Sequence, residues 1–527
     1  MSKTVDMARV SAKGSFNLLW GLVISTLISA VGSVFIARLL GSDLYGLYGI
    51  VLTAPNLIII FRDWGINSAM VRFTAQFRAE GRIDEIRSIY SSGLIFEIAA
   101  GLILSIISFL LSDFMATSVF NRPQIAPLIK IASFSILASG LITAAASAFI
   151  GYEKMGLNNV MIISQSIIKT ALVIVLVILG LGTSGATIGF TIGTVVAGLI
   201  GVILIWTIYR TLPTPFTHKL ELRAYLSAML HYCLPLSLAV ILAGFLAQFY
   251  AFLLPIHYAV DNIQIGNYGV AQNFVILITF FATPITTMLF PAFSKLNPQK
   301  DKETLRNAFQ FSVKYATLLV VPVTALVMCL SEPAVSTLFG NTYDTAPLYL
   351  ALLAITYLYT AFGNLSIVNL LNSQGQTKYV LKMTVLTAAI GFPFGYVMIL
   401  TYGVIGLIVT SLIDVIPSLI ILLRFIRKHY DLTVDWASSA KILLSSAITA
   451  ITTYFVVTAL PFASWIRLIF GVILFLIILI PAMVLTKAVT RTDIHYLADM
   501  VSAFGPIGKL LTLFLGVVEK LIVALKQ

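Results

Sequence analysis

Two charged residues stand side by side in the middle of an apolar stretch, IIIFRDWGINSAMVRF, which runs from Ile58 to Phe73. They are Arg62 and Asp63, and Asn67 follows four residues after the aspartate. An arginine binds phosphate or carboxylate groups through charge-assisted hydrogen bonds, whereas a carboxylate beside it can neutralise its charge. The stretch therefore supports two hypotheses: a charged binding site, or a pair that neutralises itself or lies at a membrane boundary.

If this stretch is helical, its polar residues fall on two adjacent stripes. One stripe has spacings of seven, four and seven residues and consists of Asn56, Asp63, Asn67 and Thr74. The neighbouring stripe has a spacing of seven and consists of Pro55, Arg62, Ala69 and Gln76. A charge that faces lipid costs at least about 2.5–3.5 kcal/mol, so we expect this side of the helix to face protein or water. Gly65 and Pro55 are expected to bend it.

Further charged residues lie in other apolar stretches. Glu97, Lys169 and Asp414 are predicted near the middle of their spans, where Glu97 and Lys169 either form an ion pair or take part in the pathway. Asp414 is a candidate for binding a coupling cation or for pairing with Lys169. Arg38, at the external end of the first span, either caps a cavity or anchors at lipid head groups. The candidates for substrate binding are thus Arg38, Arg62, Asp63, Asn67 and Lys169.

Catalytic motifs are absent from the sequence. The five histidines are scattered without ligand spacing, and there is no phosphate-binding Walker loop. The predicted external loops are too short for a catalytic domain. We therefore expect no enzyme, no metal site and no cofactor, while coupling to H⁺ or Na⁺ stays open.

Membrane spans are the elements that must position these residues. Of the 527 residues 59% are apolar and 10% charged, with a mean hydropathy of +1.00, against about 45–50% and about 25% in soluble domains. Apolar runs of about 20 residues predict an all-α polytopic membrane protein with about fourteen transmembrane helices. The predicted spans are 16–40, 45–68 (or to Phe77), 88–111, 125–149, 157–180, 185–209, 231–254, 266–291, 308–330, 346–370, 379–400, 403–425, 438–459 and 465–486.

The basic residues predict the orientation of these spans. With the N-terminus inside, 26 of the 33 lysines and arginines fall in cytoplasmic segments and four fall outside. This bias places both termini in the cytoplasm of a multi-pass protein of the cell (cytoplasmic) membrane. The net charge of +12 is then explained by topology, and a nucleic-acid partner is disfavoured.

An internal repeat predicts the domain organisation. Gly46, Tyr48 and Gly49 recur at an offset of 220 as Gly266, Tyr268 and Gly269. Each copy covers six spans, so we expect two lobes related by a pseudo-two-fold axis, with the pathway between them. The expected segments are the N-lobe at 1–210, the C-lobe at 211–430, two further spans at 431–490, and an amphipathic tail on the cytoplasmic face at 491–527.

Charge distinguishes the two lobes. The first six spans hold Arg38, Arg62, Lys130 and Lys169, against Lys314 in the second six. A cationic lobe suits an anionic substrate, because arginine and lysine bind phosphates strongly.

Three motifs resemble those of a known family. ARLLGSDLYGLYGIV, Ala37 to Val51, resembles the start of span two in the polysaccharide biosynthesis transporters, the oligosaccharide–lipid flippases. DWGINSAMVRF, Asp63 to Phe73, is similar to their D-x-G-x-x-x-A-x-x-R-[FY] continuation. LFPAFSKL, Leu289 to Leu296, is similar to the end of span eight in the wider multidrug/oligosaccharidyl-lipid/polysaccharide exporter superfamily. With its fourteen predicted spans, the chain resembles this superfamily over nearly its whole length.

This resemblance implies a flippase that moves a polyprenyl- or dolichyl-(pyro)phosphate-linked oligosaccharide across the membrane by alternating access, for polysaccharide or glycoprotein glycan assembly. Related flippases hold the pyrophosphate with arginines in the first lobe, and Arg62 and Arg38 are nearest by location. The implied partners are the lipid-linked oligosaccharide, membrane lipids and glycan-assembly enzymes, and a monomer is expected.

Three alternatives compete with this interpretation. A multidrug, cation-coupled extruder of the same superfamily is disfavoured by the basic first lobe. A membrane glycosyltransferase, polymerase or ligase is disfavoured by the short external loops. A scaffold derived from a flippase fold is disfavoured by the charges retained inside the spans.

Overall fold

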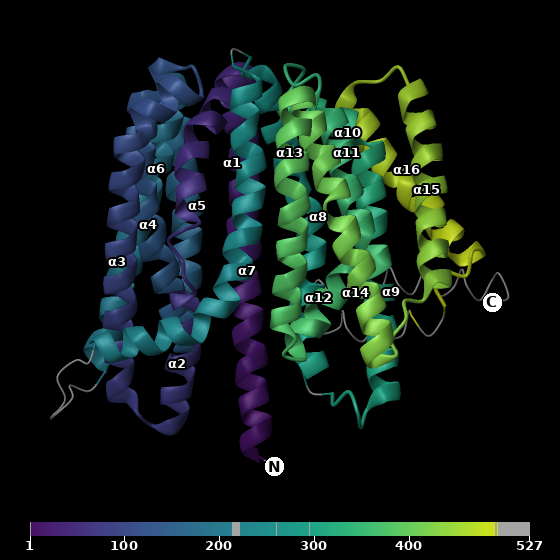
Figure 1. The fold of residues 1–527 in the computed structure, drawn as a ribbon. Coiled ribbons are helices and arrows are strands. Elements are labelled where there is room, and N and C mark those ends of the chain that lie inside the picture. The colour runs from purple at the N-terminus through teal and green to yellow at the C-terminus, as the bar shows by residue number, and fades with distance from the viewer. Residues whose placement is uncertain (1, 213–221, 260, 295, 491–492, 494–527) are drawn as a thin grey trace. The chain divides into compact units, whose positions relative to one another are not determined.

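The computed structural model describes residues 2–212, 222–259, 261–294, 296–490 and 493 (Figure 1). Helices dominate this part of the chain, and no strand occurs in it. The predicted amphipathic tail at 491–527 lies outside the described residues, apart from Asp493. The α-helices are α1 (Ser2–Ile59), α2 (Ile66–Glu80), α3 (Ile83–Phe114), α4 (Ala126–Gly151), α5 (Met155–Leu176), α6 (Gly182–Thr211), α7 (Leu222–His257), α8 (Ile263–Ser294), α9 (Lys302–Cys329), α10 (Ser331–Phe339), α11 (Ala346–Ala354), α12 (Asn364–Ser373), α13 (Thr377–Ile413), α14 (Val415–Tyr430), α15 (Trp436–Ala459) and α16 (Ser464–Leu485).

The helices confirm a polytopic membrane protein. Within the described residues nine helical stretches are long and apolar enough to cross a membrane, and the bent pair Ala346–Phe362 and Asn364–Ser373 adds another. Three of the nine, of 40, 57 and 54 residues, are about two to three times the length of roughly 20 residues that one crossing needs. Each contains a glycine with non-helical backbone, at Gly41, Gly180 and Gly403. These breaks fall where the sequence separates neighbouring spans, so the arrangement is consistent with fourteen crossings.

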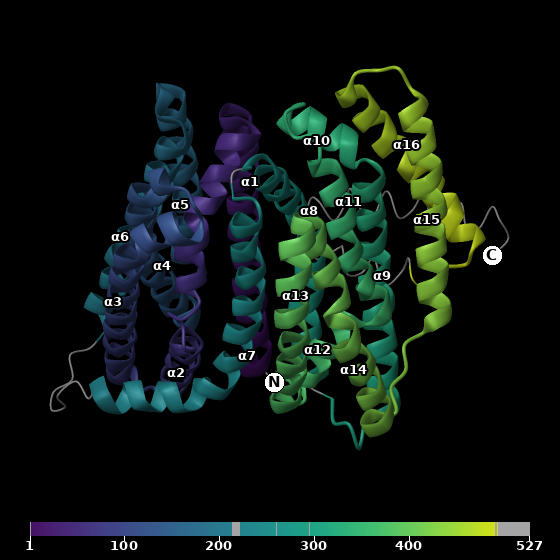
Figure 2. The same cartoon turned by 45° about the horizontal axis from the view of Figure 1, so that its top comes forward.

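The chain forms two compact units. The first comprises Met1–Val270 and Leu381–Thr410, and the second comprises Ala271–Val380 and Ser411–Gln527. In the first unit α1 and α3 to α6 pack side by side (Figure 1), and the first part of α7 runs across α2 and α3 (Figure 2). The predicted lobes at 1–210 and 211–430 and the predicted segment of two further spans at 431–490 stay predictions.

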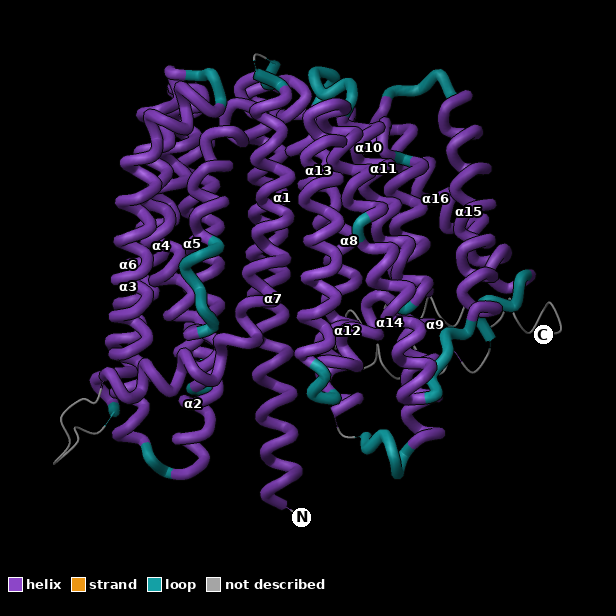
Figure 3. Tube along the Cα trace, viewed as in Figure 1, coloured by secondary structure: helices purple, strands orange, loops and turns teal. Residues whose placement is uncertain are grey.

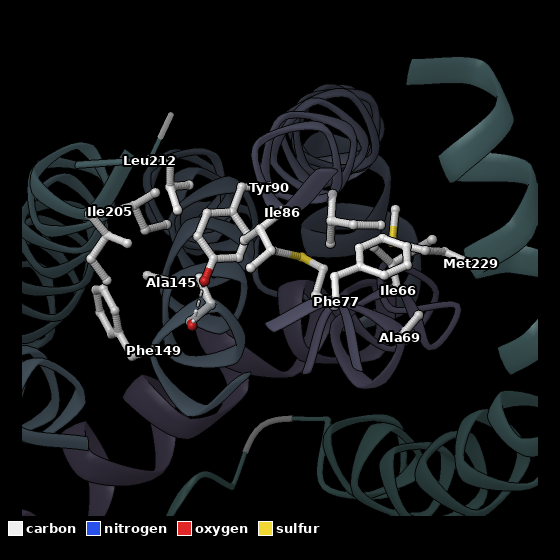
Figure 4. Packing of buried hydrophobic residues seen from close by; sticks show 14 of the residues in the cluster. Ile66, Ala69, Phe77, Ile86, Tyr90, Ala145, Phe149, Ile205, Leu212 and Met229 are labelled. Atoms are coloured by element: carbon white, nitrogen blue, oxygen red, sulfur yellow. Dashed lines mark hydrogen bonds between the residues drawn. The ribbon is translucent and has the colours of Figure 1, made fainter. Parts of the chain in front are cut away.

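A buried cluster joins α2, α3, α4, α6 and α7 in the first unit (Figure 4). Ile66 and Met70 of α2, Ile86 of α3 and Phe149 of α4 have no exposed surface. Tyr90 is also fully buried, and its hydroxyl donates a hydrogen bond of 3.0 Å to the Ala148 carbonyl. Such satisfied polar groups and close van der Waals packing hold membrane helices together, because lipid is as apolar as the side chains.

The two predicted copies of the repeat meet in the first unit. A Cβ on Gly46 of α1 would lie 1.9 Å from the Asn262 carbonyl oxygen, and one on Gly266 of α8 would lie 2.0 Å from the Ser42 carbonyl oxygen. Each clash partner is thus displaced by 220 residues from its counterpart. The crossing of α1 and α8 is reciprocal, as in a local two-fold arrangement.

The same reciprocity recurs three residues further on. A Cβ on Gly49 would lie 3.9 Å from Ile265, and one on Gly269 would lie 3.3 Å from Tyr45. These pairs also share the offset of 220. The contacts therefore support the repeat that the sequence predicts.

Arg122, between α3 and α4, binds residues at the end of α7 and just before α8, beside this crossing. Its guanidinium is buried, with 3% of the residue exposed, and Nε donates to Asn262 Oδ1 over 2.8 Å. Asn262 in turn donates through Nδ2 to Asp43 Oδ1 over 3.0 Å. The remaining N–H groups of Arg122 donate to the backbone carbonyls of Phe120, Pro255 and Tyr258.

In the second unit α9, α15 and α16 share a buried apolar core. Lys314 of α9 donates to Asp493 Oδ2 over 2.6 Å, and the Tyr315 hydroxyl donates to Asp493 Oδ1 over 3.2 Å. Asp493 is 2% exposed. This ion pair connects Asp493, which follows α16 in the sequence, to α9.

Candidate functional site

The second predicted span is broken in the middle. Helix α1 ends at Ile59, α2 begins at Ile66, and the residues between them form turns inside the helical bundle (Figure 3). The expected continuous stripe through Asn56, Asp63, Asn67 and Thr74 is therefore wrong. Only Asn67 and Thr74, which are both buried, share a helix.

Local chemistry explains the break. Asp63 Oδ1 accepts a hydrogen bond of 2.8 Å from the Gly65 N–H, a turn that competes with the helical hydrogen-bond ladder. Gly65 has φ 85° and ψ 5°, the left-handed region that glycine enters without steric cost. A Cβ there would lie 2.1 Å from Ser237 Oγ and 2.5 Å from Cys233 Cβ of α7. Both the conformation and the close approach of α7 require glycine at this position.

Arg62 lies in this break and points into a buried polar cluster. Its Nη1 donates to Glu97 Oε2 of α3 and to Thr143 Oγ1 of α4, the latter over 2.9 Å. The other carboxylate oxygen, Glu97 Oε1, accepts a hydrogen bond of 2.7 Å from Asn67 Nδ2 of α2. Arg62 is 5% exposed, Asn67 7% and Glu97 0%. The cluster thus joins the break to three helices.

Part of the hydrogen-bonding capacity of this cluster is unused. Arg62 Nε and Asn67 Oδ1 are buried and have no hydrogen-bond partner among the described residues. Arg62 Nη2 likewise donates no hydrogen bond within the described chain. The Nε–Nη2 edge of a guanidinium is a fork of two parallel donors, which matches two oxygens of a phosphate or carboxylate. Glu97 and Thr143 therefore hold Arg62 at one nitrogen and leave this edge without a partner among the described residues.

The pairing of Glu97 differs from the expectation. The predicted ion pair with Lys169 is wrong, because Glu97 pairs with Arg62. Arg62 and Asp63 form no ion pair with one another among the described residues. Lys169 of α5 is half-buried with its Nζ 6.0 Å from the ring centroid of Phe190, and it makes no ion pair with a described residue.

Of the other predicted site residues, Arg38 belongs to the first unit and Asp414 to the second. Arg38 is exposed on α1, three residues before the Gly41 break. The helix then runs from Gly41 to Ile59, about 27 Å at 1.5 Å per residue, so Arg38 and Arg62 flank opposite ends of this segment. Asp414, between α13 and α14 in the second unit, is 3% exposed and interacts electrostatically with Tyr359.

Comparison with known proteins identifies the family. The family model described as polysaccharide biosynthesis protein matches residues 35–348, which is more than half of the chain. The chain belongs to this family. The resemblance of Ala37–Val51 and Asp63–Phe73 to polysaccharide transporters is confirmed, and both stretches lie within the matched residues.

Two relatives of this polysaccharide biosynthesis protein carry informative names. It is 24% identical over 427 residues to the lipopolysaccharide biosynthesis protein WzxC of Escherichia coli (strain K12), which covers 77% of this chain and 80% of WzxC. It is 19% identical over 238 residues to the probable low-salt glycan biosynthesis flippase Agl15 of Haloferax volcanii, covering 45% and 50% of the two chains.

Solved structures with the same fold include a flippase and a drug transporter. Lipid II flippase MurJ in an inward closed conformation matches with a TM-score of 0.65 at 18% identity, over 88% of this chain and 97% of MurJ. An inward-facing multidrug resistance MATE family transporter of the MOP superfamily matches with a TM-score of 0.59 at 17% identity, over 77% and 94%. At these identities the likeness shows the fold alone. The activities stated in the names of these proteins are those of flippases and a transporter, in agreement with the expectation that this chain is not an enzyme.

Proposed function

We propose that this polysaccharide biosynthesis protein is a flippase for an oligosaccharide linked to a polyprenyl or dolichyl (pyro)phosphate. Its family and the names of WzxC, Agl15 and MurJ support this class of substrate. The chain would act as a monomer in the cytoplasmic membrane by alternating access, with both termini inside. Membrane lipids and glycan-assembly enzymes are its expected partners.

The unpaired Nε–Nη2 edge of Arg62 is the observation that carries the proposal. Non-helical backbone within a membrane is stable where it is buried in protein or lines a cavity, and transporters place their substrate sites at such breaks. Here the break presents a buried guanidinium whose Nε and Nη2 have no partner among the described residues. Two phosphate oxygens are the matching acceptors.

The remaining candidate residues take distinct roles in this proposal. Asp63 shapes the turn that presents Arg62, since it caps the Gly65 N–H. Asn67, which donates to Glu97 beside Arg62, is a candidate contact for the bound head group. Lys169 supplies a second positive charge, and Arg38 meets the head group at the external end. Asp414 remains a candidate for a coupling cation in the second unit.

A reconstituted translocation assay tests this function. Purified protein in sealed vesicles should move a lipid-linked oligosaccharide from one leaflet to the other, where an added glycan-cleaving enzyme can reach it. Vesicles without protein measure the background. Equal rates in the two preparations would contradict the proposal.

The fold also suits a multidrug exporter, as the MATE structure illustrates. A site for cationic drugs requires acidic groups that lack a counter-ion, whereas Glu97 is neutralised by Arg62. We therefore expect no increase in drug resistance when the chain is expressed in a drug-sensitive host. A broad increase in resistance, lost in Glu97→Gln, would favour the exporter.

A further inference from the structure

The charges of the Arg62 cluster balance as the structure stands. Arg62 and Glu97 form a neutral pair, of which 5% and 0% are exposed. A phosphate on the unpaired edge of Arg62 would bring further negative charge to a guanidinium that already neutralises one carboxylate. An uncompensated charge is costly in a buried site. Uptake of a proton by the carboxylate would restore the balance.

Asn67 is suited to both protonation states of Glu97. Its Nδ2 donates to the ionised carboxylate over 2.7 Å, while Oδ1 of the same amide is buried without a partner among the described residues. A protonated carboxyl group gains an O–H donor. If the amide turns end for end, Oδ1 faces that donor and accepts its hydrogen bond. The neighbour of Glu97 therefore needs only a side-chain rotation when the proton arrives.

Few other charges act on this carboxylate. Arg62 and Asp63 of the break interact electrostatically with Glu97. The other acidic, basic and histidine residues of α3 and of the helices packed against it are partly or fully exposed wherever the structure describes their burial. They are Arg38, Asp43, Arg72, Arg78, Glu80, Asp84, Glu85, Arg87, Asp113, Lys130, Arg223, His231 and His257. A proton that balances a new charge at Arg62 is therefore best placed on Glu97.

We propose that Glu97 is a proton-binding site whose occupancy follows the binding of (pyro)phosphate to Arg62. As two phosphate oxygens accept hydrogen bonds from Arg62 Nε and Nη2, Glu97 takes one proton from the aqueous phase, and it returns the proton when the phosphate leaves. The O–H bond on Glu97 is the one covalent bond formed, and the donor acid in solution loses the matching one. This inference rests on the proposed function, because it takes the lipid phosphate as the anion.

Calorimetry on the full-length protein in detergent tests the inference, with farnesyl pyrophosphate as the probe. Titration at one pH in two buffers of different ionisation enthalpy gives the number of protons taken up per bound probe. Wild type should take up about one proton more than Glu97→Gln, and Glu97→Asp should restore the uptake. Any proton that the probe itself takes up is the same for all three proteins, so it cancels in the comparison. Equal proton numbers in wild type and Glu97→Gln, with both binding, would overturn the inference.

A second measurement needs no variant and guards against misfolding of Glu97→Gln. An infrared difference spectrum of wild type should gain the C=O band of a protonated carboxylic acid when the probe is added. Absence of this band at saturating probe would overturn the inference. Failure of the proposed function is a separate result, since it appears as wild-type vesicles that move no lipid-linked oligosaccharide.

Discussion

Gly46 of α1 and Gly266 of α8 face each other so closely that neither position has room for a side chain. A Cβ on Gly46 would lie 1.9 Å from the carbonyl oxygen of Asn262, the residue before α8, and one on Gly266 would lie 2.0 Å from that of Ser42 in α1. Backbone atoms cannot rotate aside as a flexible side chain can, so a substitution must push the helices apart.

Gly46→Ala should therefore destabilise the protein by about 1–3 kcal/mol, the usual cost of overpacking. Gly49→Ala is the matched control on the same helix, because its nearest neighbour would lie at 3.9 Å, an ordinary contact. Thermal unfolding of the two purified variants in one detergent compares them. Equal unfolding midpoints for the two variants would show that α1 and α8 do not pack as closely as these glycine contacts indicate.

Arg122→Lys should destabilise the protein although it keeps the charge. Lysine lacks the planar fork that reaches Asn262 and three backbone carbonyls at once. Each lost hydrogen bond to a charged group costs about 1.5–3 kcal/mol. Arg82→Lys is the control, since Arg82 makes its hydrogen bonds to Glu80 and Glu85 in an exposed position. If the unfolding midpoints of both variants fall equally from that of wild type, Arg122 has no special role in stability.

Asp493 should make stability depend on pH. Burial alone would raise the pKa of this carboxyl, but hydrogen bonds from Lys314 and Thr490 outweigh it and lower the pKa from 3.8. A lowered folded-state pKa adds stability above the unfolded-state pKa, and this stability is lost as the pH falls through the folded-state value. Wild type should thus unfold at a higher temperature than Asp493→Asn at neutral pH, and the gap should close in acid. A gap that is constant with pH would contradict the ion pair.

The orientation of the spans can be measured with two single-cysteine positions. Ala463 and Gln299 are both exposed, and the sequence places them outside and inside the cell respectively. A membrane-impermeant maleimide should label Ala463→Cys in intact cells and Gln299→Cys only after permeabilisation. The native cysteines, Cys233 and Cys329, are buried and serve as the unlabelled background. The reverse pattern would invert the predicted topology.

Much of the fold could be predicted from the sequence, because long apolar runs leave few alternatives to membrane helices. The breaks at Gly41, Gly180 and Gly403 fall between predicted spans for the same reason. The repeat was visible as well, since the crossing needs glycine at Gly46 and Gly266.

The site was harder to predict. Helical spacing continues from Asn56 to Thr74 through a segment that is not helical, because the Asp63 turn and the Gly65 conformation interrupt the helix without disturbing the pattern. The pairing of Glu97 with Arg62 is a tertiary contact, and the positions of the spans in the sequence do not predict which charged residues pair. Thr143, which also binds Arg62, is an ordinary threonine in an apolar span and gave no signal.

The most direct test of the central claim compares two arginines in the reconstituted translocation assay. Arg62→Ala removes the buried guanidinium proposed to hold the phosphate, whereas Arg78→Ala removes an exposed one that pairs with Glu153. We expect Arg62→Ala to lose at least tenfold in the rate of lipid-linked oligosaccharide translocation, about 1.4 kcal/mol or more in activation free energy, while Arg78→Ala stays close to wild type. Arg62→Ala that is folded and translocates at the wild-type rate would contradict the account.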